Sequence, residues 1–129
     1  MSTRFHFALL LSFAGALLLM AGCTGGKELQ HYSVVTGGDE VHGKELILNY
    51  RCGACHIIPG INGADGMVGP PLILFADRTM VGGELPNTPD NLVRWIVDPP
   101  SIEPGTAMPN LGLTDKQARD VAAYLYTLR

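Results

Sequence analysis

Positive charge and β-strand patterns are both scarce in this sequence. The nine Lys and Arg residues are outnumbered by twelve Asp and Glu and form no basic stripe, which argues against a nucleic-acid partner. The shortage of strand patterns counts against a thioredoxin-like dithiol, because that motif needs a strand–helix–strand unit. Only three cysteines are present, so no second pair exists to complete a tetrahedral zinc site.

Two of the three cysteines lie in the sequence Cys52-Gly53-Ala54-Cys55-His56. Two thiols three positions apart, followed at once by a histidine, are typical of a c-type haem attachment site. Each thiol can form a thioether with one haem vinyl group, and the histidine is then held as an axial ligand of the iron. We therefore predict one covalent haem c, and a zinc site or a redox dithiol is the weaker interpretation.

The N-terminal part of the chain has the pattern of a bacterial export signal. Arg4 precedes an apolar run over residues 7–20, which is short for a membrane-spanning helix and suits a signal peptide over residues 1–22. The small residues before Cys23 resemble a lipoprotein motif in which the cysteine is lipidated, although Met20 replaces its usual leucine. We predict a lipid on Cys23; the alternative is an ordinary signal or an uncleaved anchor with an incidental cysteine.

The length of 129 residues fits one small domain in addition to the targeting segment. Residues 23–38 contain two Gly-Gly pairs and are predicted to form the lipid-anchored, flexible tether. The folded domain is predicted over residues 39–129. Any of these N-terminal signals places the domain outside the cytoplasm, facing the periplasm or the cell exterior, which is where haem is attached to such motifs in bacteria.

Four segments of the domain have helical patterns. They are residues 39–51, a short helix from Pro71, a helix begun by Thr88 and stopped by Asp98, and a last helix begun by a capping box of Thr114 and Gln117. The side chains expected to face inward in the first two are Val41, Leu46, Ile47 and Tyr50, and Leu72, Leu74 and Phe75. Residues 57–88 otherwise form a Gly- and Pro-rich loop, long enough to wrap a large apolar group. We expect the last helix to pack across the first.

The second axial ligand of the iron is sought among the methionines. Outside the targeting segment these are Met67, Met80 and Met108. Met108 lies in a loop that prolines stiffen on both sides, which lowers the entropic cost of holding a weak thioether ligand. We predict Met108 as the ligand, with the other two methionines or an open coordination site as alternatives.

The order of these motifs resembles that of the class I mono-haem cytochromes c from about Asp39 to the C-terminus. The matching features are the Cys-Cys-His motif at 52–56, Gly69-Pro70, Arg78, Trp95, Pro104-Gly105-Thr106 before Met108, and an amphipathic C-terminal helix. In particular, the chain resembles the cytochrome domain associated with subunit II of bacterial haem-copper oxidases, and the free-standing relatives of that domain. The resemblance implies a small all-α fold, with three to four helices and long loops wrapped around one covalent haem.

The resemblance also implies roles for further residues at the haem. Pro70 would offer its carbonyl oxygen to the ring N–H of His56, Arg78 and Thr106 would lie near the haem propionates, and Trp95 would lie on the side of Met108. Mitochondrial-type members carry a lysine at the position of Ala107 and a basic ring around the haem edge. This chain lacks both, so the resemblance does not imply docking by positive charge.

With His56 and Met108 both bound, the iron would have no free position for a substrate, and the protein is not expected to be an enzyme. The predicted function is one-electron transfer in a respiratory chain. The expected donor is a quinol-oxidising complex or a dehydrogenase, and the expected acceptor is a terminal oxidase. The alternatives are a fixed haem subunit of a respiratory complex and, if Met108 does not bind, an open-site haem enzyme or sensor.

Overall fold

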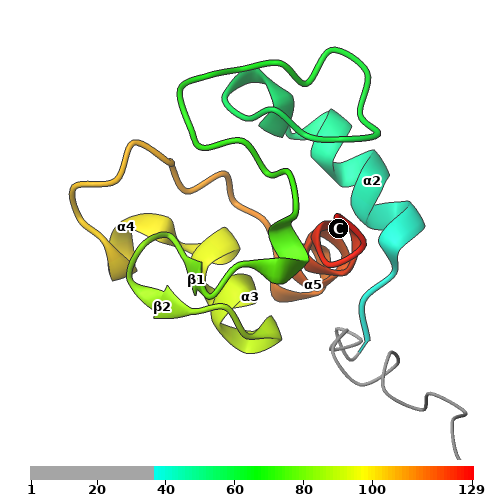
Figure 1. Ribbon diagram of the computed structural model, residues 1–129. Helices are drawn as coiled ribbons and strands as arrows, with labels where there is room; N and C mark the ends of the chain where they lie inside the picture. The colour runs from blue at the N-terminus through cyan, green and yellow to red at the C-terminus, as the bar shows by residue number, and fades with distance from the viewer. Residues whose placement is uncertain (1–36) are drawn as a thin grey trace, which may run out of the picture. The chain divides into compact units, whose positions relative to one another are not determined.

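The computed structural model describes residues 37–129 (Figure 1). The predicted signal peptide, the predicted lipidation site at Cys23 and most of the predicted tether lie outside the described residues. The described part is mainly helical, as predicted, with one small two-stranded sheet. Its elements are helix α2 (Glu40–Asn49), the 3-10 turns η1 (Cys52–Ala54) and η2 (Phe75–Asp77), strands β1 (Met80–Val81) and β2 (Leu85–Pro86), and helices α3 (Pro89–Val97), α4 (Pro99–Ile102) and α5 (Asp115–Leu125). Within residues 37–129, none of these helices combines the length and the hydropathy needed to span a bilayer.

Helix α2 is fixed at its N-terminus by Asp39. The Asp39 carboxylate accepts hydrogen bonds from the backbone N–H groups of Val41 and His42, at 2.9 and 3.1 Å, which have no partner inside the helix. Leu46 and Ile47 are buried as predicted, but Val41 is 66% exposed, so its predicted inward position is wrong. Helix α5 covers α2 at Gly43, and a residue two positions away points to the opposite side of an α-helix.

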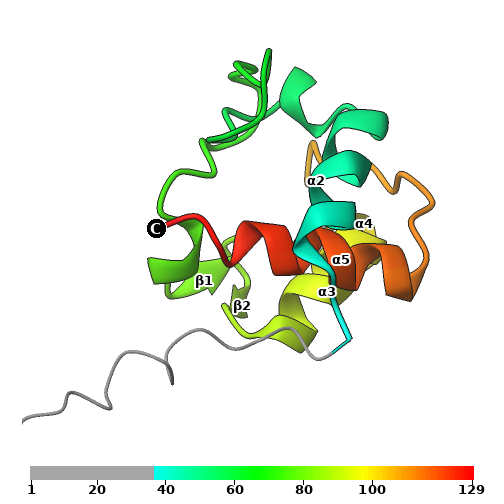
Figure 2. The same ribbon diagram turned by 90° about the vertical axis from the view of Figure 1, so that its right-hand side faces the viewer.

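Helices α2 and α5 cross in close contact, as predicted (Figure 2). A Cβ atom at Gly43 would overlap the backbone carbonyl of Asp120, so only glycine permits this approach. The C-terminal helix is amphipathic as predicted. Its buried apolar stripe consists of Ala118, Val121, Ala122, Leu125 and, just beyond the helix, Leu128. The helix starts at the predicted capping box, in which the Thr114 side chain and the Gln117 side chain each bind the other residue's backbone N–H.

The segment between Cys55 and Thr88 differs from the prediction in two ways. No helix begins at Pro71. Instead, the carbonyls of Pro71 and Ile73 accept hydrogen bonds from the Arg78 side chain, and Leu74 has a left-handed backbone (φ 51°) that stops any helix. Leu74 is therefore exposed, whereas Phe75 is buried as expected. The second difference is the antiparallel hairpin of β1 and β2, paired through Met80 with Pro86 and Val81 with Leu85.

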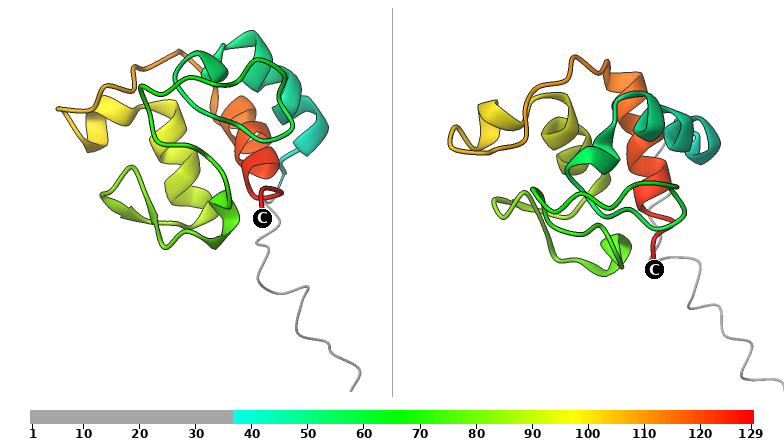
Figure 3. Two further views of the ribbon diagram at one scale, coloured as in Figure 1. Left: turned by 45° about the horizontal axis from the view of Figure 1, so that its top comes forward. Right: turned by 90° about the horizontal axis from the view of Figure 1, so that it is seen from above.

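Helix α3 begins and ends where predicted. The Thr88 hydroxyl accepts a hydrogen bond from the Asn91 N–H, and the helix stops before Asp98. The one-turn helix α4 follows directly and was not predicted, because two prolines after Asp98 are also typical of a helix stop. Proline also suits the first turn of a helix, and here it begins one. The segment between α4 and α5 contains no helix or strand and follows the outer edge of the domain (Figure 3).

Candidate functional site

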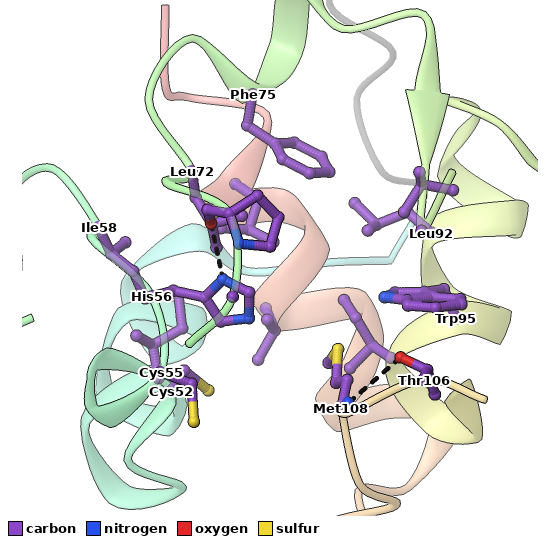
Figure 4. A pocket seen from close by; sticks show the side chains of 18 of the residues that line it. Cys52, Cys55, His56, Ile58, Leu72, Phe75, Leu92, Trp95, Thr106 and Met108 are labelled. Carbon is purple, nitrogen blue, oxygen red and sulfur yellow. Dashed lines mark hydrogen bonds between the residues drawn. The ribbon is translucent and has the colours of Figure 1, made fainter. Parts of the chain in front are cut away.

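A cavity of about 440 Å³ lies between the C-terminal end of α2, the segment after Cys55, helix α3 and the loop before α5. This volume is within the range of cofactor sites, about 300–1,000 Å³. Most of the lining is apolar. It includes Ile58, Leu72, Phe75 and Leu92 (Figure 4), and also Ile96 and Leu125. Among residues 37–129, Arg51 and Arg78 are the only Lys, Arg, Asp or Glu residues that line it. The cavity therefore suits a large, mainly apolar group.

The two cysteines reach the cavity on a tight turn. Arg51 has a left-handed backbone (φ 55°), which ends α2 and redirects the chain into the 3-10 turn η1. The His56 N–H then donates to the Cys52 carbonyl at 3.0 Å, which folds the five-residue motif onto itself. Both thiols are free and line the cavity, and burial raises the pKa of the Cys52 thiol. Cys52 and Cys55 are thus presented together with His56, as the motif predicts.

His56 is oriented by two neighbours. Its Nδ1 lies 2.8 Å from the carbonyl oxygen of Pro70, which can only accept, so Nδ1 carries the proton and Nε2 has a free lone pair. The imidazole also lies flat against Gly69, where a Cβ atom would be 2.7 Å from Nδ1 and 2.9 Å from Nε2. Figure 4 shows Nε2 facing the cavity. The ring is therefore held in the tautomer and direction that an axial iron ligand requires.

Met108 lies on the wall of the cavity that faces His56 (Figure 4). Its backbone N–H donates to the Thr106 hydroxyl at 3.2 Å, which stabilises the loop. The other two predicted candidates are placed differently. Met67 is 86% exposed and does not line the cavity, and Met80 lines it but is 43% exposed.

Trp95 and Thr106 both lie beside Met108 (Figure 4). Trp95 is buried, and its ring packs on Gly82, where a Cβ atom would be 2.5–2.7 Å from the ring carbons. The indole nitrogen points into the cavity, and no hydrogen bond to it is present within residues 37–129. The Thr106 hydroxyl accepts from Met108 and keeps its own hydrogen free to donate. The Trp95 indole N–H and the Thr106 hydroxyl are thus two hydrogen-bond donors in the cavity lining that could bind an acidic group of a ligand.

Arg78 is also in the wall of the cavity, but its guanidinium is engaged by the protein. It donates to the carbonyl of Pro71 and, at 3.3 Å, to that of Ile73. Its positive charge lies 5.5 Å from the centre of the Phe75 ring. Arg78 thus lines the cavity, and its place near a propionate stays a prediction; these backbone contacts were not predicted.

The sequence interpretation missed a buried carboxylate outside the cavity. Asp120 is fully buried and binds the backbone N–H of Asp39, the Nδ1 of His42 (both at 2.8 Å) and the ammonium of Lys116 (2.5 Å). Burial alone would raise the pKa of Asp120, but the hydrogen bonds from Lys116 and His42 outweigh it and hold the pKa below its ordinary value. His42 is therefore a partner of Asp120 and does not line the cavity. The available signal was an acidic residue between the apolar positions of α5.

A helical domain whose apolar cavity has a Cys-x-x-Cys-His turn on one wall and a methionine on the facing wall is a haem-binding domain of the c type. A family model described as Cytochrome c matches residues 41–129, which is more than half of the chain. The chain therefore belongs to the cytochrome c family, and the predicted small all-α cytochrome c fold is confirmed. The domain is a haem c domain of the electron-transfer class.

Three curated proteins named cytochrome c oxidase subunit 2 are similar to the chain. That of Alkalihalophilus pseudofirmus is 31% identical over 88 residues, which are 67% of this chain and 25% of the relative. That of Bacillus sp. strain PS3 is 33% identical over 89 residues, 66% of this chain and 25% of the relative. That of Bacillus subtilis is 31% identical over 108 residues, 80% of this chain and 30% of the relative. The chain thus spans less than a third of the length of these relatives, and no solved structure gives a significant match.

Proposed function

We propose that this protein carries single electrons in a respiratory chain through one covalent haem c. Cys52 and Cys55 would hold the haem by thioethers, and His56 and Met108 would be its axial ligands. The observation that carries the proposal is the placement of His56 and Met108 on facing walls of one apolar cavity. When bound, haem c supplies an Fe(III)/Fe(II) couple that takes up and gives back one electron.

The residues around the cavity would keep the site suited to electron transfer. Pro70 and Gly69 fix the ring of His56, so a change of iron charge would require little movement. The apolar lining and a thioether ligand both favour the less charged ferrous state and hence a relatively high potential. Trp95, Thr106 and Arg78 would face the propionates. With both axial positions taken, no position is left for a substrate, which supports a carrier and not an enzyme.

We further propose that the protein is a membrane-anchored lipoprotein that acts outside the cytoplasm. The anchor would be the lipid on Cys23, followed by the tether over residues 23–38. The donor would be a quinol-oxidising complex or a dehydrogenase, and the acceptor a terminal oxidase. The similarity to three oxidase subunits supports the choice of acceptor.

The axial ligand is tested by replacing Met108. The oxidised wild-type protein should show the long-wavelength sulfur-to-iron absorption band, and Met108→Ala should lose it. Met67→Ala is the matched control, because Met67 is exposed outside the cavity and its loss should leave the band unchanged. A Met108→Ala protein that keeps the band would refute the ligand assignment. Mass spectrometry of the mature protein would measure the covalent haem and the acylation of Cys23 together.

A fixed haem subunit of a respiratory complex is the second candidate function, because the similar proteins are themselves named as oxidase subunits. Purification of the native protein from membranes at moderate salt distinguishes the two. A stable, stoichiometric complex with an oxidase would support the fixed subunit, and recovery of the cytochrome alone would support the mobile carrier.

A further inference from the structure

Arg78 is connected to the proximal ligand by a short series of backbone contacts. The His56 ring donates to the carbonyl of Pro70, and the next carbonyl along the chain, that of Pro71, accepts from the Arg78 guanidinium. A second contact from the same guanidinium reaches the carbonyl of Ile73 at 3.3 Å. One side chain therefore holds both ends of residues 71–73, immediately after the carbonyl that orients His56.

We propose that Arg78 is a positioning residue for the proximal ligand: its guanidinium fixes residues 70–73, and through them the hydrogen bond between Pro70 and His56. This inference rests on the proposed function, because it treats His56 as the haem ligand. It assigns to Arg78 a role that depends on the shape of its guanidinium, in addition to the charge that it presents to the cavity.

The guanidinium suits this role better than another cation would. Its planar fork offers several N–H donors in fixed directions, so it can bind two carbonyls at once. The Phe75 ring beneath it, 5.5 Å away, restricts its rotation. A lysine has the same charge but presents it as a point on a flexible stem, and it cannot reproduce the fork.

The backbone that carries Arg78 is held in place by Asn87. The Asn87 side-chain amide donates to the carbonyls of Phe75 and Arg78, both at 3.1 Å, and the Asn87 backbone N–H donates to the Thr79 carbonyl at 2.9 Å. These bonds hold the backbone of η2 and of the residues after it against the start of α3. Asn87 does not line the cavity, so it acts on the site only through the backbone that carries Arg78.

Tyr126, just after α5, completes this support. Its hydroxyl donates to the Asn87 side-chain oxygen at 2.9 Å, and its ring packs edge-on against Phe75 with 6.1 Å between centres. Burial raises the pKa of Tyr126 to about 12, so the hydroxyl keeps its proton at any physiological pH. A continuous series of contacts therefore runs from Tyr126 through Asn87 and Arg78 to the segment that orients His56.

The test measures the His56–Pro70 hydrogen bond directly. In the ferrous, diamagnetic holoprotein, the solvent exchange rate of the His56 Nδ1 proton is followed by NMR. Arg78→Lys should accelerate this exchange by between about twofold and about tenfold, the equivalent of one hydrogen bond. Arg94→Lys is the matched control, because Arg94 is exposed on α3 and donates only to Asn91 at 3.4 Å. It should leave the exchange rate unchanged.

An Arg78→Lys protein with the wild-type exchange rate would overturn the inference, because the positive charge alone would then be sufficient at this position. If Arg78→Lys fails to assemble with haem, Tyr126→Phe decides: faster exchange supports the inference, and wild-type exchange overturns it. Failure of the proposed function is a separate result. It would be seen in the wild-type protein, as the absence of covalent haem or of the sulfur-to-iron band, before any variant is compared.

Discussion

Gly69 is the residue at which a single methyl group should disturb the proximal ligand most directly. In Gly69→Ala the new Cβ atom would be 2.7 Å from Nδ1 of His56. Favourable contacts between non-bonded heavy atoms begin near 3.5 Å, and Cε1 of the same ring would be closer still, so the imidazole has to move by at least about 0.8 Å. We expect the ring to tilt away from Gly69, which changes its angle to the Pro70 carbonyl.

The tilt should bend the hydrogen bond from Nδ1 to Pro70, which is 2.8 Å in the structure. Hydrogen bonds weaken steeply as they bend, and loss of the whole bond would remove about 0.5–1.5 kcal/mol. This bond makes the imidazole a more basic ligand, which stabilises Fe(III) more than Fe(II). Its loss should therefore raise the reduction potential, by up to about 60 mV if the whole effect falls on the ferric state.

The potential is measured by spectroelectrochemical titration of the purified holoproteins. Met67→Ala is the control, because it changes the same loop at a side chain that is 86% exposed. A rise in Gly69→Ala with no change in Met67→Ala would support the reasoning. A Gly69→Ala protein with normal haem content, an unchanged potential and an unchanged exchange rate of the His56 ring proton would refute it.

Three further predictions concern stability and docking. Asp120→Asn should destabilise the holoprotein by about 1–3 kcal/mol at pH 7, as measured by urea unfolding. Because the pKa of Asp120 is lowered in the folded state, the carboxylate contributes fully above the ordinary carboxyl pKa near 4. The difference in stability between the variant and the wild type should therefore shrink as the pH falls below that value. The rate of electron transfer to an isolated oxidase, measured by stopped-flow absorbance, should change less than about twofold between low and physiological salt. Ala107→Lys adds a positive charge at the cavity and should make this rate more salt-dependent. Cys52→Ala/Cys55→Ala protein made without haem should be largely unfolded when measured by circular dichroism, because an empty cavity would lie at the centre of its core. Native-like resistance to proteases would contradict this prediction.

The parts of the fold that follow from neighbouring residues could be predicted from the sequence. The caps at Thr88 and Thr114 are local, since a side-chain oxygen binds an N–H two or three residues away. The apolar stripe of α5 is set by helix periodicity alone. The turn that presents Cys52 and His56 is contained in five consecutive residues, so its motif was sufficient.

The features that escaped prediction depend on contacts between distant segments. Leu74 has a left-handed backbone because Arg78 takes the nearby carbonyls, and nothing next to Leu74 in the sequence signals this. The hairpin strands have two residues each, too few for an alternation pattern. Asp120 is buried because Asp39 and His42, some 80 positions earlier, supply its hydrogen bonds. Such pairings become visible only once the chain is folded.

Among the candidate site residues, geometry separates positions that the sequence could not rank. Met67, Met80 and Met108 are chemically identical, and only their burial and the direction of the cavity distinguish them. For Arg78, the sequence indicated a position near the haem but gave no information on its backbone partners. Side-chain direction depends on the path of the loop, and that path is set by Asn87 and Tyr126.

The cap at Asp39 has a consequence for how the domain can be connected to other structures. Helix α2 has ten residues and is about 15 Å long, with Asp39 at one end and the cysteine turn beyond the other. The Asp39 amide is bound by Asp120, so the chain enters the domain at the crossing of α2 and α5, and none of residues 37–40 lines the cavity. We therefore expect that a lipid, a membrane segment or another folded domain can be joined before residue 37 without a change to the residues that line the cavity.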